Sequence, residues 1–258
     1  MKMSVEDYIK HACSQHRKML AVLLDPEELQ EYSSVCQIGR QIREHHPDFV
    51  FVGGSTFFET PDVLISQIKE FTEEIPIVIF PGHPAQFTPA ADALLFLSLI
   101  SGNNPDMLIG QQAASARKIK ESGIETISMG YILVDGGRES ATARITGTRP
   151  IPASDSERIA DTALAGEMLG LHLIYLEAGS GALHPAGGNL IRIVRSSIRV
   201  PLIVGGGMHS AAEAEAAWGA GADIVVIGNH LEESPADLAL FVEARNKMNT
   251  HQMQSAVM

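Results

Sequence analysis

The sequence predicts an α/β barrel of eight parallel strands and alternating helices, in which a loop replaces the third helix. Three observations lead to this fold class. Short apolar runs, most of them about one helix length apart, recur along the 258 residues. The last two runs both end in glycine, at Gly205-Gly206-Gly207 and at Gly228. Prolines fill the stretch in which the third helix would lie, and they disfavour a helix there.

Each element follows from its apolar pattern and from the residues that end it. The first strand ends in Asp25-Pro26, and acidic residues then open a helix, which suits a helix amino end. Pro61 suits the first turn of the second helix. The expected strands are residues 19–24, 49–52, 75–80, 93–99, 126–134, 172–176, 201–204 and 223–227. The expected helices are residues 4–16, 27–46, a segment starting near Pro61, 105–122, 154–169, 189–198, the Ala-rich stretch between the last two strands, and 235–247.

Two connections depart from the regular alternation of strands and helices. The third contains Pro81-Gly82-His83-Pro84 and Pro89, and it leaves too few residues for a helix before the next strand. Residues 135–153 form a long polar loop, which indicates a functional lid or a mobile segment. Ser154 and Glu157 then have the spacing of a capping box.

The chain is expected to form a single barrel domain over residues 1–248, followed by a disordered tail over residues 249–258. A doubly wound open sheet is the competing architecture. Eight regular units and a pair of glycine turns at the last two strands favour closure.

The composition restricts the classes of function. With 31 acidic and 19 basic residues, the net charge of -12 argues against a broad nucleic-acid footprint or an acidic membrane surface as partner. Anions must therefore be bound locally, by backbone N–H groups and a metal. The two cysteines favour a reducing cytoplasm. Because no apolar run is long enough to span a bilayer, a soluble protein is expected.

The glycine turns after the last two strands indicate a phosphate site. Glycine lets backbone N–H groups approach an anion, and in barrel enzymes a phosphate site commonly follows these strands. The alternative is that the glycines only turn the chain.

Asp25 and Ser55 follow the first and second strands and offer oxygen ligands. Oxygen ligands at the strand ends suit Mg²⁺ that also bridges to the phosphates of a substrate. The alternative is that both side chains cap the helices that follow them.

Tyr175 and Glu177 alternate with Leu176, so both point into the barrel if Leu176 faces the helices. An inward glutamate is unfavourable unless it has a partner, and a role in binding or deprotonating a polyol hydroxyl accounts for it. A structural ion pair with an arginine is the alternative.

The strand-end motifs resemble those of one known family. They are Leu24-Asp25-Pro26, Val52-Gly53-Gly54-Ser55, Phe80-Pro81-Gly82, Tyr175-Leu176-Glu177-Ala178-Gly179-Ser180-Gly181, Val204-Gly205-Gly206-Gly207 and Ile227-Gly228-Asn229. In this order, over nearly the whole chain, they resemble the larger members of the geranylgeranylglyceryl phosphate synthase family. The resemblance implies a modified TIM barrel without its third helix. It also implies Mg²⁺-dependent transfer of a polyprenyl group, most simply geranylgeranyl, from its diphosphate to a hydroxyl of sn-glycerol 1-phosphate, in ether lipid synthesis.

The resemblance also assigns residues. Asp25 and Ser55 would hold Mg²⁺, and Glu177 and Tyr175 would be catalytic. Ala93, Leu95 and Leu97 are candidates for lining a prenyl channel, with core packing as the alternative. Glycerol 1-phosphate would bind at Tyr175, Leu176, Glu177, Ala178, Gly179, Ser180, Gly181, Gly206, Gly207, Gly228 and Asn229.

One departure from the family concerns charge. Leu23 stands where smaller members carry a lysine. Either the larger members dispense with that charge, or Lys18, Arg138 or other loop arginines contact the diphosphate instead. A homo-oligomer and transient contact with a membrane surface are also expected.

Two other functions compete with prenyl transfer on the same barrel. One is a phosphosugar isomerase that uses Asp25 and Asp135 as acid and base; Schiff-base chemistry is disfavoured because no lysine is placed inside the barrel. The other is a barrel that binds a phosphate ligand without catalysis.

Overall fold

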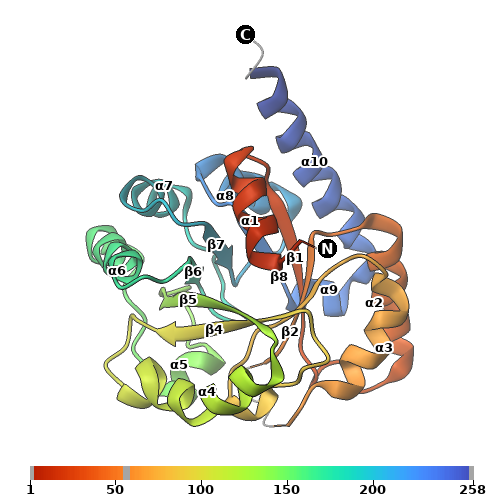
Figure 1. The fold of residues 1–258 in the computed structure, drawn as a ribbon. Coiled ribbons are helices and arrows are strands. Elements are labelled where there is room, and N and C mark those ends of the chain that lie inside the picture. Colours follow the sequence, from red (N-terminus) through yellow and green to blue (C-terminus); the bar gives the residue numbers. More distant parts are fainter. Residues whose placement is uncertain (1–2, 55–58, 256–258) are drawn as a thin grey trace.

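The computed structural model describes residues 3–54 and 59–255, and it shows a closed barrel of parallel strands (Figure 1). Each strand pairs with the next along the chain, and β8 pairs with β1 through the register Ala21 to Val226. This closing pair rules out the open doubly wound sheet. The strands are β1 (Met19–Leu24), β2 (Phe49–Val52), β3 (Ile77–Ile79), β4 (Ala93–Leu99), β5 (Glu125–Leu133), β6 (Leu173–Glu177), β7 (Leu202–Gly205) and β8 (Ile224–Ile227).

Helices surround the strands on the outside of the barrel (Figure 1). Helix α1 instead covers the amino ends of the strands, because the N–H groups of Val5 and Glu6 donate to the carboxylate of Glu125 at the start of β5, at 2.8 and 2.7 Å. The helices are α1 (Val5–Ser14), α2 (Tyr32–His45), α3 (Asp62–Thr72), η1 (Pro84–Gln86), η2 (Asp106–Gly110), α4 (Gln111–Ser122), α5 (Ala141–Thr146), α6 (Ser156–Met168), α7 (Gly188–Ser197), α8 (Ala211–Ala220), α9 (Asn229–Glu233), η3 (Pro235–Asp237) and α10 (Leu238–Ser255).

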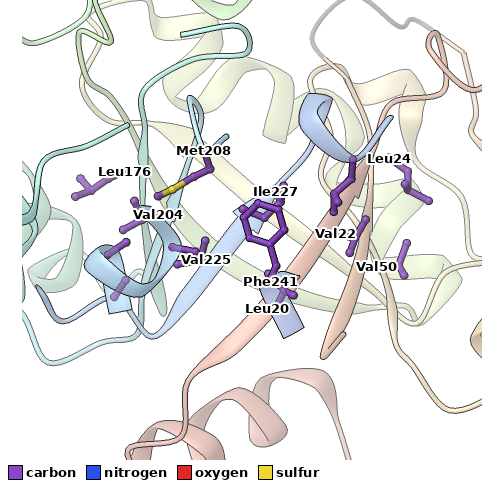
Figure 2. Close-up of a cluster of buried hydrophobic side chains, with 14 of the residues drawn as sticks. Leu20, Val22, Leu24, Val50, Leu176, Val204, Met208, Val225, Ile227 and Phe241 are labelled. Carbon is purple, nitrogen blue, oxygen red and sulfur yellow. The ribbon is translucent and has the colours of Figure 1, made fainter. Parts of the chain in front are cut away.

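Alternation along the strands divides the core into two clusters. One fills the barrel and includes Phe51, Met129 and Tyr175. The other lies between the strands and the helices and includes Leu20 and Leu176. Figure 2 shows part of this outer cluster. Tyr175 therefore points inward and its neighbour Leu176 outward, as the sequence predicts.

The predicted loss of the third helix is confirmed. Residues 80–92, all of them described, form only the short 3₁₀ helix η1 between β3 and β4. Pro81 and Pro84 remove backbone donors that an α-helix would need. The face of β3 and β4 that a helix would cover is left to loop residues such as Phe87, which is 3% exposed.

The predicted start of the first crossover helix at residue 27 is wrong. Helix α2 begins at Tyr32, and no acidic residue lies in its first turn. A side-chain oxygen of Asp25 accepts the N–H of Glu27 at 3.0 Å, and the carbonyl of Asp25 accepts the N–H groups of Glu28 and Leu29. Asp25 thus closes a tight turn directly after β1, and this turn precedes the helix.

The predicted capping box at Ser154 and Glu157 is also wrong. Helix α6 begins at Ser156 with Asp155 as its N-cap residue, and no side chain caps it. A capping box forms instead at α8, between Ser210 and Glu213.

The long loop after β5 has more structure than the sequence indicates. It contains α5, whose N-cap residue Ser140 is 2% exposed. Ile151 pairs with Val134 in a parallel bridge, and its N–H donates to the carbonyl of Leu133 at 2.9 Å. The loop is therefore anchored at both ends, and α5 lies over the carboxyl end of the barrel.

The expectation of a disordered tail from Asn249 is wrong for residues 249–255, which continue helix α10. The side chain of Asn249 accepts the N–H of Lys18 at 2.7 Å and donates to its carbonyl at 3.1 Å, which fastens α10 to the start of β1. Within residues 3–54 and 59–255, no helix combines the length and the apolar character needed to cross a bilayer.

Phe241 of α10 is 1% exposed and packs in the outer cluster among side chains of β1 and β8 (Figure 2). We expect Phe241→Ala to lower the free energy of unfolding by about 3–5 kcal/mol, because it removes a buried ring and leaves a cavity. Urea denaturation measures this change. Leu240→Ala on the same helix is the matched control, since Leu240 is 53% exposed, and its effect should stay within about 0.5 kcal/mol. Equal effects of the two substitutions would contradict the packing.

Candidate active site

The carboxyl ends of the strands surround a cavity of about 1240 Å³ that is open to solvent. Residues from every strand end or the loop after it contribute to its wall. The convergence expected for a barrel is therefore present. The predicted site residues that line the cavity are Asp25, Tyr175, Glu177, Ser180, Gly181, Gly206, Gly207, Gly228 and Asn229.

Three of the predicted site residues that the structure describes are not part of this wall. Leu176 points outward into the cluster under the helices. Ala178 and Gly179 act through their backbones: the N–H of Ala178 donates to the carbonyl of Gly205, and Gly179 donates to Glu177. Ser55 lies outside the described residues.

Glu177 is the most enclosed carboxylate of the cavity, at 6% exposure. One of its oxygens accepts the N–H of Gly179 at 2.6 Å, and the hydroxyls of Tyr175 and Tyr131 also hydrogen-bond to its side chain. Burial raises the pKa of Glu177 to about 7, although these three donors oppose the shift. A carboxyl group with such a pKa can accept and release a proton at neutral pH.

Aromatic rings form the floor beneath Glu177. The ring of Tyr175 stacks on Phe80 with a centroid distance of 5.1 Å and lies 5.4 Å from Tyr131. Tyr131 is opposite Tyr175 in the register of β5 and β6. Burial and the nearby Glu177 raise the pKa of both tyrosines, so each hydroxyl keeps its proton and acts as a donor.

The glycine turn after β7 is required by the close approach of Glu177. Gly206 has φ +79°, and a Cβ there would lie 2.2 Å from Oε1 of Glu177 and 2.5 Å from the nitrogen of Gly179. Gly205 is equally confined, since a Cβ would lie 2.1 Å from the hydroxyl of Tyr175. Only glycine fits this contact between β6 and β7.

The turns after β6 and β8 are joined by a direct contact. The hydroxyl of Ser180 donates to Oδ1 of Asn229 at 2.8 Å. Together with Gly206, Gly207 and Gly228, these residues form one concave wall of the cavity, which we call the glycine wall. A wall of backbone N–H groups, a hydroxyl and an amide is suited to a phosphate group.

The part of the wall beside β1 and β2 is acidic. Asp25 is half-buried, and desolvation raises its pKa to about 6. Its N–H donates to Oε1 of Glu232 at 3.0 Å, and burial raises the pKa of Glu232 to about 7, although this hydrogen bond opposes the shift. A Cβ on Gly54 would lie 2.2 Å from a carboxylate oxygen of Asp25, so the turn after β2 fits closely around it.

None of the described residues that line the cavity is a lysine or an arginine. Lys18 is not a candidate, because it is 7% exposed at the amino end of β1 and donates to the carbonyl of Ala222 at 2.8 Å. Arg138 and the other loop arginines are also absent from the wall, and Leu23 faces the cavity directly. Of the two alternatives that the sequence leaves open, the described wall favours the one in which larger members of the family do without this charge.

Sequence reasoning missed several polar residues of the site, among them one tyrosine, one glutamate and two histidines. Tyr131 was detectable, because alternation along β5 places it on the inward face with Met129 and Leu133. Glu232, His209 and His230 carry no such signal, since they lie on α9 or in a turn and reach the cavity only through the fold.

A second, smaller groove adjoins the cavity beside the missing helix. It lies between the loop after β3 and helix α4, and its walls include Phe87, Leu95 and Ile119. Leu97, Gln111 and Gln112 border both spaces. Of the predicted channel residues, Leu95 and Leu97 thus line open space, whereas Ala93 is fully buried in the barrel core.

The described residues include no group of three histidine, cysteine or acidic side chains arranged to hold a metal ion. A metal at Asp25 would therefore depend on water and substrate oxygens for most of its ligands. Mg²⁺ is commonly bound in this way, through one or two carboxylates and substrate phosphates.

Comparison with known proteins agrees with this geometry. Residues 13–245 match the PcrB family. A geranylgeranylglyceryl phosphate synthase of Spirosoma linguale is 44% identical over 85% of this chain and 88% of its own length. One from Korarchaeum cryptofilum is 38% identical over 96% of this chain and 100% of its own.

A solved structure is similar over the whole fold. The crystal structure of (S)-3-O-geranylgeranylglyceryl phosphate synthase from Thermoplasma acidophilum, in complex with its substrate sn-glycerol-1-phosphate, has a TM-score of 0.88. It is 31% identical and covers 95% of this chain and 100% of its own.

Gly206→Ala should weaken the binding of inorganic phosphate, because the new methyl group displaces Glu177. It should also lower the free energy of unfolding by more than the roughly 1 kcal/mol that an unfavourable φ alone costs. Isothermal calorimetry and urea denaturation measure the two effects. Gly123→Ala is the matched control, since Gly123 has φ +71° but open space around it. If both variants bound phosphate like the wild type, the glycine wall would not be an anion site.

Proposed function

The chain belongs to the PcrB family, and we propose that it is a prenyltransferase that joins sn-glycerol 1-phosphate to a long-chain polyprenyl diphosphate. The products are an ether-linked prenylglyceryl phosphate and pyrophosphate. The observation that carries the proposal is the buried carboxylate of Glu177 beside the glycine wall, where a phosphorylated polyol would place its hydroxyl groups.

The glycerol phosphate is assigned to the wall formed by the turns after β6, β7 and β8. Gly206 and Gly207 offer backbone, and Ser180 and Asn229 offer side-chain groups, for the phosphate. The similar Thermoplasma acidophilum enzyme binds this same substrate. The glycine wall lies close to Glu177, because the backbone of Gly206 packs against its carboxylate.

Glu177 is proposed as the general base. A hydroxyl oxygen of glycerol phosphate forms a bond to C1 of the prenyl group, the bond from C1 to the diphosphate oxygen breaks, and pyrophosphate leaves with the electron pair. The hydroxyl proton passes to Glu177, which the pKa of about 7 permits near neutral pH. Tyr175 and Tyr131 hold the carboxylate in place through their hydroxyls.

The diphosphate is assigned to the acidic wall beside β1 and β2, with Mg²⁺ held by Asp25 and by Ser55. The residues present fit such an ion: Asp25 is a half-buried carboxylate in a cavity with no lysine or arginine among its described residues, and Gly54 leaves its oxygens room. When bound, Mg²⁺ would offset the negative charge that builds on departing pyrophosphate. Asp25 itself orients the turn that forms this wall, through its contact with the N–H of Glu27.

The prenyl chain is assigned to the apolar side of the cavity and to the adjoining groove. Leu97 borders both spaces, and Leu95 and Phe87 continue the apolar wall where the third helix is missing. The cytoplasmic location, the homo-oligomer and transient contact with a membrane surface remain parts of the proposal.

Isomerase chemistry is less well supported. It would require Asp135 to act with Asp25, but Asp135 is not among the residues of the cavity wall, and its carboxylate accepts the N–H of Gly137 at 2.9 Å. A Schiff base would require a lysine there, and none of the described lining residues is a lysine.

The purified protein should convert radiolabelled sn-glycerol 1-phosphate and at least one member of a ladder of prenyl diphosphates into a labelled ether lipid. Glu177→Gln should lower kcat by about 10²–10⁴ with a smaller change in KM, because it removes the base but keeps a polar side chain. In the wild type, kcat should fall about tenfold per pH unit below the pKa of Glu177, because only the ionised carboxylate accepts the proton.

Glu243→Gln is the matched control for this substitution, since Glu243 is exposed on α10. No incorporation with any prenyl diphosphate would contradict prenyl transfer and favour a non-catalytic barrel. Unchanged turnover in Glu177→Gln would contradict only the role of this residue as base.

Removal of divalent cations with a chelator should abolish turnover, and excess Mg²⁺ should restore it. Asp25→Asn should weaken Mg²⁺ binding in calorimetry in the presence of a prenyl diphosphate. A chelator already saturated with Mg²⁺ is the control. Full activity in the free chelator would contradict metal dependence.

A further inference from the structure

The charges of the cavity leave the phosphate of glycerol 1-phosphate without an evident cationic partner. Three carboxylates, Asp25, Glu177 and Glu232, line the cavity, and none of the described lining residues is a lysine or an arginine. The only described side chains of the wall that can carry a positive charge are His209 and His230. Each comes two residues after the glycine turn that follows β7 or β8.

His230 is held by an acidic partner outside the cavity. Its Nε2 lies 2.8 Å from Oδ2 of Asp237 in η3, and its ring packs edge-on against Phe241 at a centroid distance of 5.7 Å. The side chain is 20% exposed. A carboxylate on one ring nitrogen fixes the orientation of the ring, as in other histidine–carboxylate pairs.

His209 reaches the same region from the turn after β7. Its Nε2 lies 3.3 Å from the carbonyl of Ala182, which follows Ser180 and Gly181 of the glycine wall. The backbone N–H of His209 donates to Oε2 of Glu213 at 2.8 Å. Glu213 also belongs to the capping box of α8. The rings of His209 and His230 meet edge-on at 6.4 Å, so the two imidazoles adjoin each other beside Asn229.

We propose that His209 and His230 together form the cationic part of the phosphate site, with Asp237 as a positioning residue that orients His230. The inference rests on the proposed function, because it takes the phosphate of sn-glycerol 1-phosphate as the ligand of the glycine wall. A phosphate dianion on the glycine wall would lie beside both rings, whose N–H groups can donate to it. Charge-assisted hydrogen bonds to phosphate are also the stronger kind.

The test measures the affinity of the full-length protein for sn-glycerol 1-phosphate and for inorganic phosphate by isothermal calorimetry at slightly acidic pH. His209→Gln and His230→Gln should each raise both dissociation constants about tenfold, because each removes a charged donor but keeps an amide. An equal loss for both ligands locates the effect at the phosphate. The KM for the prenyl diphosphate should not change.

His11→Gln is the matched control. His11 is exposed on α1 at the amino end of the barrel, so its substitution should change the affinities by less than about twofold. Asp237→Asn should weaken phosphate binding less than His230→Gln, and combining the two should add no further loss, since Asp237 acts through His230.

A second measurement does not depend on variants that keep their fold. In histidine side-chain nuclear magnetic resonance spectra of the wild type, addition of sn-glycerol 1-phosphate should shift two ring signals and leave that of His11 in place. Through-bond correlation to the backbone assigns those signals in the wild type.

Unmoved ring signals, or a His209→Gln and His230→Gln double variant that binds as tightly as the wild type, would overturn the inference and make the His230–Asp237 pair a structural contact only. A wild-type protein that binds neither phosphate ligand would overturn the proposed function as well. The two failures are therefore distinguishable.

Discussion

The structure of the site depends on one buried contact, between the carboxylate of Glu177 and the backbone of Gly206. Glu177 accepts the N–H of Gly179 and the hydroxyls of two tyrosines, so the end of β6 can keep a carboxyl group that is 6% exposed. The turn after β7 must then pass within a side chain's width of it, and only glycine permits that approach. The same glycines that make room for the carboxylate also expose the backbone that a phosphate would bind.

The electrostatics of the cavity follow from this arrangement. A site for two anionic substrates would ordinarily be basic, yet the described wall carries three carboxylates and no lysine or arginine. Under the proposed function, backbone N–H groups and histidines would bind one anion, and a metal at Asp25 would bind the other. Glu177 adjoins the first of these regions, because it lies against Gly206.

The order and type of the elements were predictable from the sequence, whereas several of their ends were not. Strand β4 has the predicted bounds, 93–99, because an apolar run bordered by polar residues is a local signal. Helix α2 starts five residues later than predicted, at Tyr32 instead of residue 27, because the side chain of Asp25 captures the N–H of Glu27. Asn249 was expected in a disordered tail, but its contact with Lys18 joins residues far apart in the chain.

The sequence by itself determined the eight strands, the gap at the third helix and the glycine turns, since hydrophobic alternation and chain-turning residues act over a few neighbouring positions. It also pointed to Asp25 and Glu177, because each follows or ends a strand. Only the tertiary structure decided their partners: Tyr131 beside Glu177, Glu232 at the turn of Asp25, and Asp237 behind His230. These contacts join different strands and loops. Closure of the barrel creates them, and no local pattern encodes them.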